Sequence, residues 1–173
     1  MTPHLVAMVR PSLLLIALAA CAGTAPAPSS SPPGRPVPEP LQYFVGAWEG
    51  KTRQASGQVM TLSWRVAPAL RGAWLAGESR VAEIGVEARD FLGVQAGRIV
   101  RVYVDSNGTR AAMSSPGWQA SSMTWEGEAH TADGRQVRVR EVIERVDDRT
   151  FRARWEVWSE HGWTLMSEET LAR

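Results

Sequence analysis

Three side chains that can bind a metal ion lie close together in the sequence. Glu126, Glu128 and His130 alternate along residues 121–130, so in a β-strand all three project from the same face. Carboxylates and an imidazole together suit a divalent cation. Side chains two apart in a strand are separated by about 7 Å, which is too far for all three to bind one ion without a bend. The spacing favours a solvated sheet face, and we expect no metal site.

Glu78 is the carboxylate with the best prospects for acid–base chemistry, because Trp74 and Ala76 precede it on the same segment. Inside a barrel its pKa would rise, and it could exchange protons with a ligand. A buried charge normally persists only with a partner, so an arginine pair or a place at the rim is the stronger expectation. We keep Glu78 as a candidate lining residue. The sequence has no Gly-x-Ser-x-Gly elbow and no glycine-rich phosphate loop, and we do not expect an enzyme.

Large apolar side chains recur at alternate positions and would converge inside a closed sheet. There they would either fill a solid core or line a cavity for a hydrophobic or aromatic ligand. Glycines within strands leave space or mark bends, and Gly72, Gly77, Gly93 and Gly127 favour the cavity. We therefore expect a ligand-binding barrel, with no cofactor. The expected lining residues are Met60, Trp64, Met123, Trp125, Phe151 and Trp155.

Further tryptophans leave a second function open. Trp118, Trp158 and Trp163 fall near turns or on polar faces, where they would rim a cavity mouth or dock a protein partner. The alternative to a ligand-binding barrel is thus a solid-core interaction barrel in the periplasm. An enzyme that uses a carboxylate of the barrel interior ranks last.

The elements that would position these residues are short strands. Residues 59–66, 121–130 and 150–158 alternate apolar and polar side chains, the pattern of half-buried strands. Val100, Val102 and Val104 make a further apolar face. Hairpin turns are indicated at Asn107-Gly108, Asp133-Gly134, Ala96-Gly97, Asp147-Asp148 and His161-Gly162. The spacing predicts an all-β fold, a single antiparallel up-and-down barrel of about eight to ten strands, with a short helical turn over residues 41–45 leading into it.

The N-terminus carries an export signal. Leu18-Ala19-Ala20-Cys21 closes an apolar run that begins at Leu13, and it has the aliphatic–small–small–cysteine form of a bacterial lipobox. The run is too short to span a bilayer, which takes about 20 residues. We expect residues 1–20 to be a lipoprotein signal peptide and Cys21 to become the lipidated first residue. A secreted chain whose cysteine lies near the cut by chance is the less favoured alternative.

Composition divides the rest of the chain in two. Residues 21–40 contain 7 prolines and almost no bulky apolar groups, so they predict an extended tether. Residues 41–173 predict the barrel domain. The charges are interspersed and nearly balanced, which argues against nucleic acid as a partner. Two or more lipid chains on Cys21 would give stable anchoring. Because Ala22 follows the cysteine, we expect the outer membrane, facing the periplasm.

Three segments resemble a bacterial family of lipocalin-like, or calycin-type, barrels, the domain-of-unknown-function family 1579. They are Gly46-Ala47-Trp48-Glu49-Gly50, residues 70–78 and residues 140–148. The resemblance implies an antiparallel barrel with Gly46, Trp48 and Gly50 at its closed end, and no settled activity. In calycins an arginine of the last strand often lies over this tryptophan. Only Arg173 could serve here, and we do not expect the stacking.

A related group of barrels binds haem through a histidine late in the chain. His161 is placed in a turn by its neighbour Gly162, and His130 falls on the polar face of its strand. Neither is a convincing haem ligand, and we expect no haem.

Overall fold

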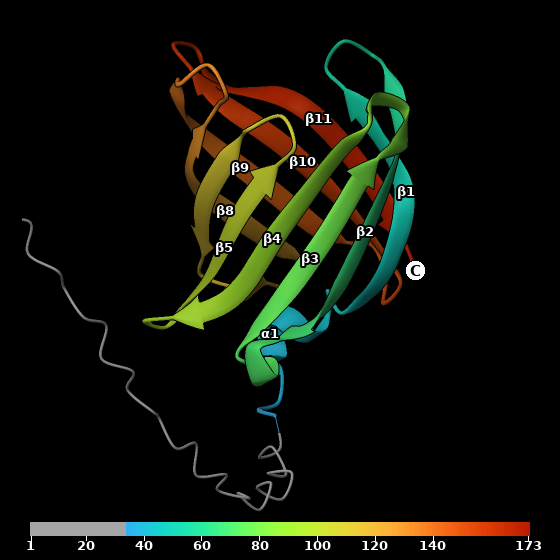
Figure 1. Cartoon of the computed structure of the whole chain (residues 1–173), viewed down its shortest axis with the longest axis vertical. Coiled ribbons are helices and arrows are strands. Elements are labelled where there is room, and N and C mark those ends of the chain that lie inside the picture. The colour runs from blue at the N-terminus through green and yellow to red at the C-terminus, as the bar shows by residue number, and fades with distance from the viewer. Residues whose placement is uncertain (1–33) are drawn as a thin grey trace, which may run out of the picture. The chain divides into compact units, whose positions relative to one another are not determined.

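The strands, in which apolar and polar residues alternate, form a closed antiparallel barrel. The computed structural model describes residues 34–173, and within that range ten strands form the ring (Figure 1). Each strand pairs with the next along the chain, and the ring closes where β1 pairs with β11 and β6 with β8. The two-residue strand β7 pairs with β8 beside the ring. The predicted fold class is confirmed.

The elements follow one another with short connections. Their bounds are α1 Glu39–Gln42, β1 Gly46–Gln54, β2 Val59–Ala69, the 3₁₀ turn η1 Leu70–Gly72, β3 Trp74–Val81, the 3₁₀ turn η2 Ala82–Ile84, β4 Val86–Gln95, β5 Arg98–Asp105, β6 Arg110–Ser115, β7 Trp118–Gln119, β8 Ser122–His130, β9 Gln136–Arg145, β10 Thr150–Ser159 and β11 Gly162–Ala172. The hairpin turns lie where the dipeptides predict them: Gly108 and Gly134, for example, have φ of 86° and 81°.

Two glycines let strands approach closely where the barrel closes. A Cβ on Gly50 would lie 1.8 Å from the carbonyl oxygen of Thr170 on β11. A Cβ on Gly127 would lie 1.9 Å from that of Ala112 on β6. Any side chain at either position would collide with backbone, so these two glycines are needed at the β1–β11 and β8–β6 contacts.

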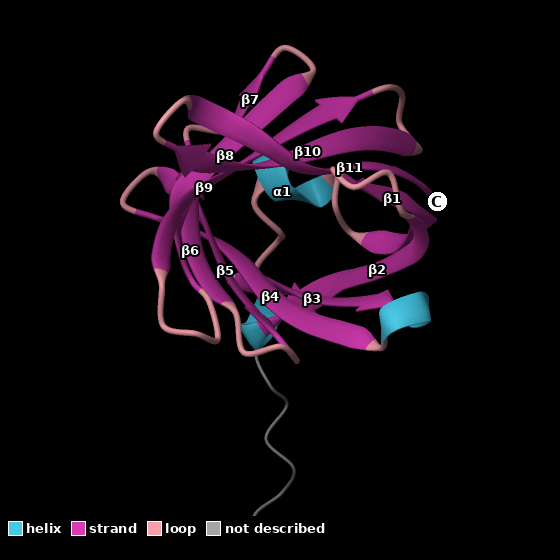
Figure 2. Ribbon diagram, turned by 90° about the horizontal axis from the view of Figure 1, so that it is seen from above, coloured by secondary structure: helices cyan, strands magenta, loops and turns pink. Residues whose placement is uncertain are grey.

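The short helix α1 lies across one end of the barrel (Figure 2). Aromatic side chains pack around it, and we call this the plugged end. Leu41 and Phe44 are fully buried there. The ring of Phe44 stacks on Trp118 at 5.6 Å between ring centres, and the indole N–H of Trp118 donates to the carbonyl oxygen of Pro40. The short helix begins two residues before the predicted turn, because Pro40 lies in its first turn, where proline is well tolerated.

The valines of β5 face outward, although an apolar face is normally expected to point into the barrel. Ile99 and Arg101 are buried inside the barrel, whereas Val102 is 46 % exposed on the outer face and Val104 is similarly exposed. The valine face of β5 is therefore the outer face. Arg101 can occupy the inner face because buried carboxylates neutralise its charge, as described below.

The predicted export signal lies outside the described residues. Cys21, the signal peptide 1–20 and most of the predicted tether 21–40 belong to this part of the chain, and so they stay predictions. Within residues 34–173 no helix is long and apolar enough to cross a membrane.

Candidate ligand-binding cavity

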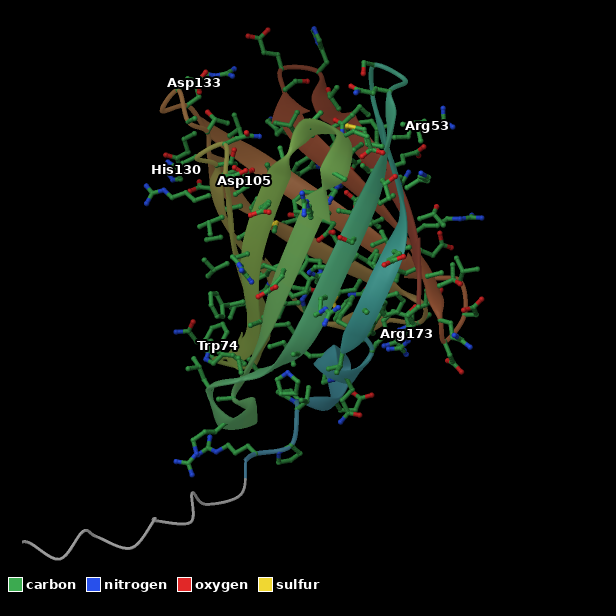
Figure 3. The ribbon with its side chains drawn as sticks, turned by 45° about the vertical axis from the view of Figure 1, so that its right-hand side comes forward. Arg53, Trp74, Asp105, His130, Asp133 and Arg173 are labelled. Atoms are coloured by element: carbon green, nitrogen blue, oxygen red, sulfur yellow. The ribbon has the colours of Figure 1, made fainter. Side chains whose placement is uncertain are left out.

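A cavity of about 570 Å³ occupies the half of the barrel away from α1. Residues of four turns line its mouth, among them Gln54, Ile84, Asn107 and Arg135; we call this the open end. Asp105, His130 and Asp133 lie toward it in Figure 3, while Trp74 and Arg173 lie near α1. The barrel is thus solid at the plugged end and hollow at the open end.

The predicted lining residues divide between these two halves. Met60, Trp64, Phe151 and Trp155 line the cavity. Met123 and Trp125 also point inward, but they are buried in the packed core and do not line the cavity. Period-two alternation fixes which face a side chain takes, and it carries no information on the depth at which the barrel becomes hollow.

Glu78 is on the outer face, so its assignment to the cavity lining is wrong. Its side chain is 59 % exposed and forms an ion pair with Arg89 of the neighbouring strand. The inward positions of β3 are those of Leu75 and Gly77, which are buried. The side chains of Glu78, Trp74 and Ala76 lie on the same face of β3, and this face points outward.

The floor of the cavity contains a buried charge cluster that sequence analysis did not predict. Arg101 donates through Nη1 to Glu141 and through Nη2 to Asp90, the latter at 3.0 Å. The side chains of Arg101 and Asp90 are only 7 % and 1 % exposed. Burial alone would lower the pKa of Arg101, but the carboxylates of Glu141 and Asp90 raise it. The arginine therefore stays charged.

Aromatic rings hold this arginine from two sides. Its guanidinium carbon lies 5.5 Å from the ring centre of Trp64 and 5.5 Å from that of Trp155, a range in which cation–π attraction operates. The indole N–H of Trp64 also donates to Asp90 at 3.2 Å. Trp64 and Trp155, both predicted lining residues, thus contact the charge cluster as well as lining the cavity.

Glu169 is the fourth titratable residue of the floor. It projects inward from β11 between the buried residues Ser167 and Leu171, and it lines the cavity. Burial, and secondarily the charge of Glu141, raise the pKa of Glu169 to about 8. Burial is also the first reason why the pKa of Glu141 is raised. Glu169 is therefore mostly protonated in the empty barrel at neutral pH.

Tyr103 completes the polar wall between the floor and the open end. Its hydroxyl donates to Asp105 at 3.3 Å, and burial followed by the charge of Asp105 raises the pKa of Tyr103. Its ring lies 6.2 Å from that of Trp155. The sequence carries a signal for one of the missed residues, since Glu141 interrupts the inward series Val137, Val139 and Ile143 of β9.

The four glycines Gly72, Gly77, Gly93 and Gly127 support close packing instead of opening space, contrary to our expectation. Gly72 lies in the turn η1 and the other three lie in strands. A Cβ on Gly77 would lie 2.2 Å from Asp90 Oδ1 and 2.6 Å from Trp64 Nε1. Gly93 is covered by the ring of Trp74 and Gly72 by the carbonyl oxygen of Arg35. Gly77 is the one that matters for the site, since its missing side chain makes room for the Asp90–Trp64 contact.

The acidic residues considered for metal binding lie outside the barrel. Glu126 and Glu128 are exposed, and Glu128 accepts a hydrogen bond from Gln136 at 2.8 Å. Among residues 34–173 no group of three histidine, cysteine, aspartate or glutamate side chains is placed to hold a metal ion.

The remaining tryptophans take two different positions. Trp118 packs in the plugged end, where Arg145 lies 3.7 Å above its ring. Trp158 is 46 % exposed on the outer face of the β10–β11 hairpin and makes an edge contact with Trp163 at 5.3 Å. Arg138 lies over both rings of this pair.

The Gly46–Trp48–Gly50 segment closes the plugged end with help from the chain terminus. Trp48 is fully buried and donates to the carbonyl oxygen of Phe44. The guanidinium carbon of Arg173 lies 4.7 Å from the Trp48 ring centre, so our expectation that this stacking is absent is wrong. Gly46 has φ of 140°, a backbone conformation that other residues rarely adopt, and the Arg173 side chain packs against this position.

Comparison with known proteins supports the fold alone. No family model matches the chain, and no curated protein matches it. The crystal structure of Rv2717c from M. tuberculosis has a TM-score of 0.60 and 12% sequence identity, covering 79% of this chain and 98% of that one. This chain is a closed β-barrel. A redesigned β-barrel has a TM-score of 0.37 and 11% identity, covering 80% of this chain and 98% of that one. Membership of family 1579 stays a prediction.

Proposed function

We propose that this protein is a binding module that holds one small, largely apolar molecule inside its barrel. The cavity at the open end carries the proposal, because its volume of about 570 Å³ falls in the range of small-molecule sites, about 300–1,000 Å³. Its wall includes Met60, Leu62, Phe151 and Leu171. Apolar walls with a few convergent polar groups are the common form of such a site.

The barrel architecture supports a preformed site. Every strand of the ring is hydrogen-bonded to two neighbours. The wall of the cavity therefore has no unpaired edge strand. The plugged end is packed with buried aromatic side chains, and the mouth is lined by turn residues of the opposite end. A ligand would therefore enter between the turns of the open end and stop at the Arg101 cluster.

A matched pair of substitutions tests the proposal. Ala111 lines the cavity, and its neighbour Ala112 is exposed on the outer face of β6. We expect 1-decanol to change the intrinsic tryptophan fluorescence of the full chain in a saturable manner, since Trp64 and Trp155 line the cavity. Ala111→Phe should weaken this binding at least about tenfold by occupying the space. Ala112→Phe should leave it unchanged; equal effects of both variants would contradict an interior site.

We further propose that the module works at the bacterial cell envelope, anchored through lipid on Cys21. The lipobox Leu18-Ala19-Ala20-Cys21 supports this, as does the proline-rich composition that follows it. Cells expressing the full chain should incorporate a palmitate analogue into the wild type and not into Cys21→Ala. An unlabelled wild type, or label that persists in the variant, would overturn the anchoring.

The Trp158–Trp163 pair, in which Trp158 is exposed and Trp163 half-buried, favours one second candidate function, a barrel that docks a protein partner on its outer face. Aromatic residues and arginine are enriched at such interfaces, and Arg138 lies over both rings. Crosslinking in intact envelopes would favour docking if a defined partner is recovered from the wild type and lost in Trp158→Ala. Recovery that does not depend on Trp158 would count against it.

A further inference from the structure

We infer that the molecule held in the cavity carries a positively charged amino group, which binds between the carboxyl groups of Glu169 and Glu141. This inference rests on the proposed function and specifies its ligand: an amine with an aliphatic or aromatic body. Three features of the cavity point to this ligand: the excess of acidic groups at its floor, the unpaired carboxyl group of Glu169 and the aromatic rings beside it.

The floor has more acidic than basic groups. Asp90, Glu141 and Glu169 face a single cation, Arg101, and both terminal nitrogens of that arginine already donate to Glu141 and Asp90. Its remaining nitrogen Nε is buried without a partner and out of contact with the cavity space. An anionic head group would find no free cationic donor here and would meet carboxyl groups instead. The floor therefore favours a cationic head group over the carboxylate of a fatty acid or a phosphate.

Glu169 is the floor residue that lacks a partner. In the part of the chain that the structure describes, its carboxyl group makes no hydrogen bond and no ion pair. The neighbouring strands place Ala153 of β10 and Thr52 of β1 beside it, and neither carries a charge. The other titratable and charged residues that line the cavity are Arg80, Arg101, Tyr103, Asp105, Arg135 and Glu141. Arg80 is exposed, and Arg135 is paired with Asp133 at the mouth. A cation next to Glu169 would favour its ionised form and make a charge-assisted hydrogen bond.

The walls beside Glu169 suit a cation as well. Tyr103 and Trp155 line the cavity with ring centres 6.2 Å apart, and aromatic faces attract ammonium groups. Trp155 already accepts one cation in this way, the guanidinium of Arg101. Above the floor, Met60, Leu62 and Ala129 offer apolar surface for the body of the ligand.

Four molecules with similar chains separate the possible head groups: decylamine, 1-decanol, 2-undecanone and decanoic acid. Each is titrated calorimetrically into the full chain at pH 8, where a primary amine with a pKa of about 10.4 is still protonated. We expect decylamine to bind at least about tenfold more tightly than 1-decanol. We expect decanoic acid to bind more weakly than either.

Two neighbouring glutamates provide the variants. Glu169 faces the cavity, and Glu168 is exposed on the outer face of the same strand. Glu169→Gln should remove the advantage of decylamine over 1-decanol and keep 1-decanol binding, which also shows that the variant is folded. Glu168→Gln should behave as the wild type.

The outcomes distinguish the two proposals. If 1-decanol binds inside the barrel but decylamine has no advantage, or 2-undecanone or decanoic acid binds best, the amine inference is overturned and the binding module stands. If decylamine keeps its advantage in Glu169→Gln, the inference is overturned as well. If none of the four molecules binds, the proposed function itself fails.

Discussion

Arg101 of β5 donates a hydrogen bond to the carboxylate of Glu141 on β9, across the interior of the barrel. Two strands that are not neighbours in the ring are thereby joined through side chains. Asp90 of β4 completes the arrangement from the other side of the guanidinium. The ion pairs fix the floor of the cavity, and removal of one member leaves the others buried without compensation.

Arg101→Met should therefore be strongly destabilising. We expect a loss of about 3–5 kcal/mol in the free energy of unfolding, because Asp90 and Glu141 would remain buried without their cation. Arg89→Met is the control: its ion pair with Glu78 is largely exposed and should cost about 1 kcal/mol or less. Urea unfolding of the two variants measures the difference, and similar losses would contradict the role of the buried cluster.

Gly77→Ala should disturb the same cluster without removing any charge. The new methyl group would lie 2.2 Å from Asp90 Oδ1, so Asp90 and Trp64 must shift, at a cost of about 1–3 kcal/mol. Ser79→Ala, at the next inward position of β3, should cost less. The comparison uses urea unfolding followed by tryptophan fluorescence; a neutral Gly77→Ala would show that the floor is not tightly packed there.

Arg173→Ala should loosen the plugged end. Arg173 lies over Trp48 and donates to the carbonyl oxygens of Val45 and Asp148, both at 2.8 Å. Together these contacts should be worth about 1–3 kcal/mol. Hydrogen exchange of residues 39–45 should accelerate in the variant, while Arg152→Ala, an exposed substitution on β10, should leave it unchanged. Unaltered exchange in Arg173→Ala would mean that the terminus does not secure the plug.

Glu169 should make the barrel less stable as the pH rises from acid to neutral. Burial and the Glu141 charge raise its pKa from the ordinary value of 4.5 to about 8. Between these values the folded state holds a proton that the unfolded state has lost, so the free energy of unfolding falls with pH, by up to about 1.4 kcal/mol per pH unit. Above pH 8 this dependence ends.

Urea unfolding at pH 5, 6, 7 and 8 measures this effect. Glu169→Gln should flatten the slope, and Glu168→Gln should keep it. Glu141, whose pKa is also raised, contributes in the same direction and is present in all three proteins. Equal slopes for the wild type and Glu169→Gln would contradict the assignment.

The sequence predicts the barrel and part of the wall, since alternation and turn dipeptides are local signals. Met60, Trp64, Phe151 and Trp155 follow from their place in clear alternating strands. The charge cluster at the floor of the cavity cannot be predicted in this way, because an apolar–polar pattern assigns every charged side chain to the outer face. Arg101 is inward only because Asp90 and Glu141, from other strands, compensate it. Pairing across a closed ring is a long-range property that a single strand does not encode.

Two further misassignments have similar causes. Glu78 shares the phase of Trp74, and a large aromatic residue is an unreliable marker of the inner face: Trp74 covers Gly93 on the outside. The stacking of Arg173 on Trp48 depends on where the chain end returns beside β1, and sequence position alone does not reveal this.

Methionine NMR tests the central claim, that the hollow half of the barrel is a ligand site, most directly. Met60 lines the cavity, whereas Met123 is buried in the packed core. With ¹³C-labelled methionine methyl groups, titration of the full chain with 1-decanol should shift the Met60 signal saturably at one equivalent and leave Met123 unmoved. A Met60 signal that does not respond, while the protein stays folded, would contradict the account.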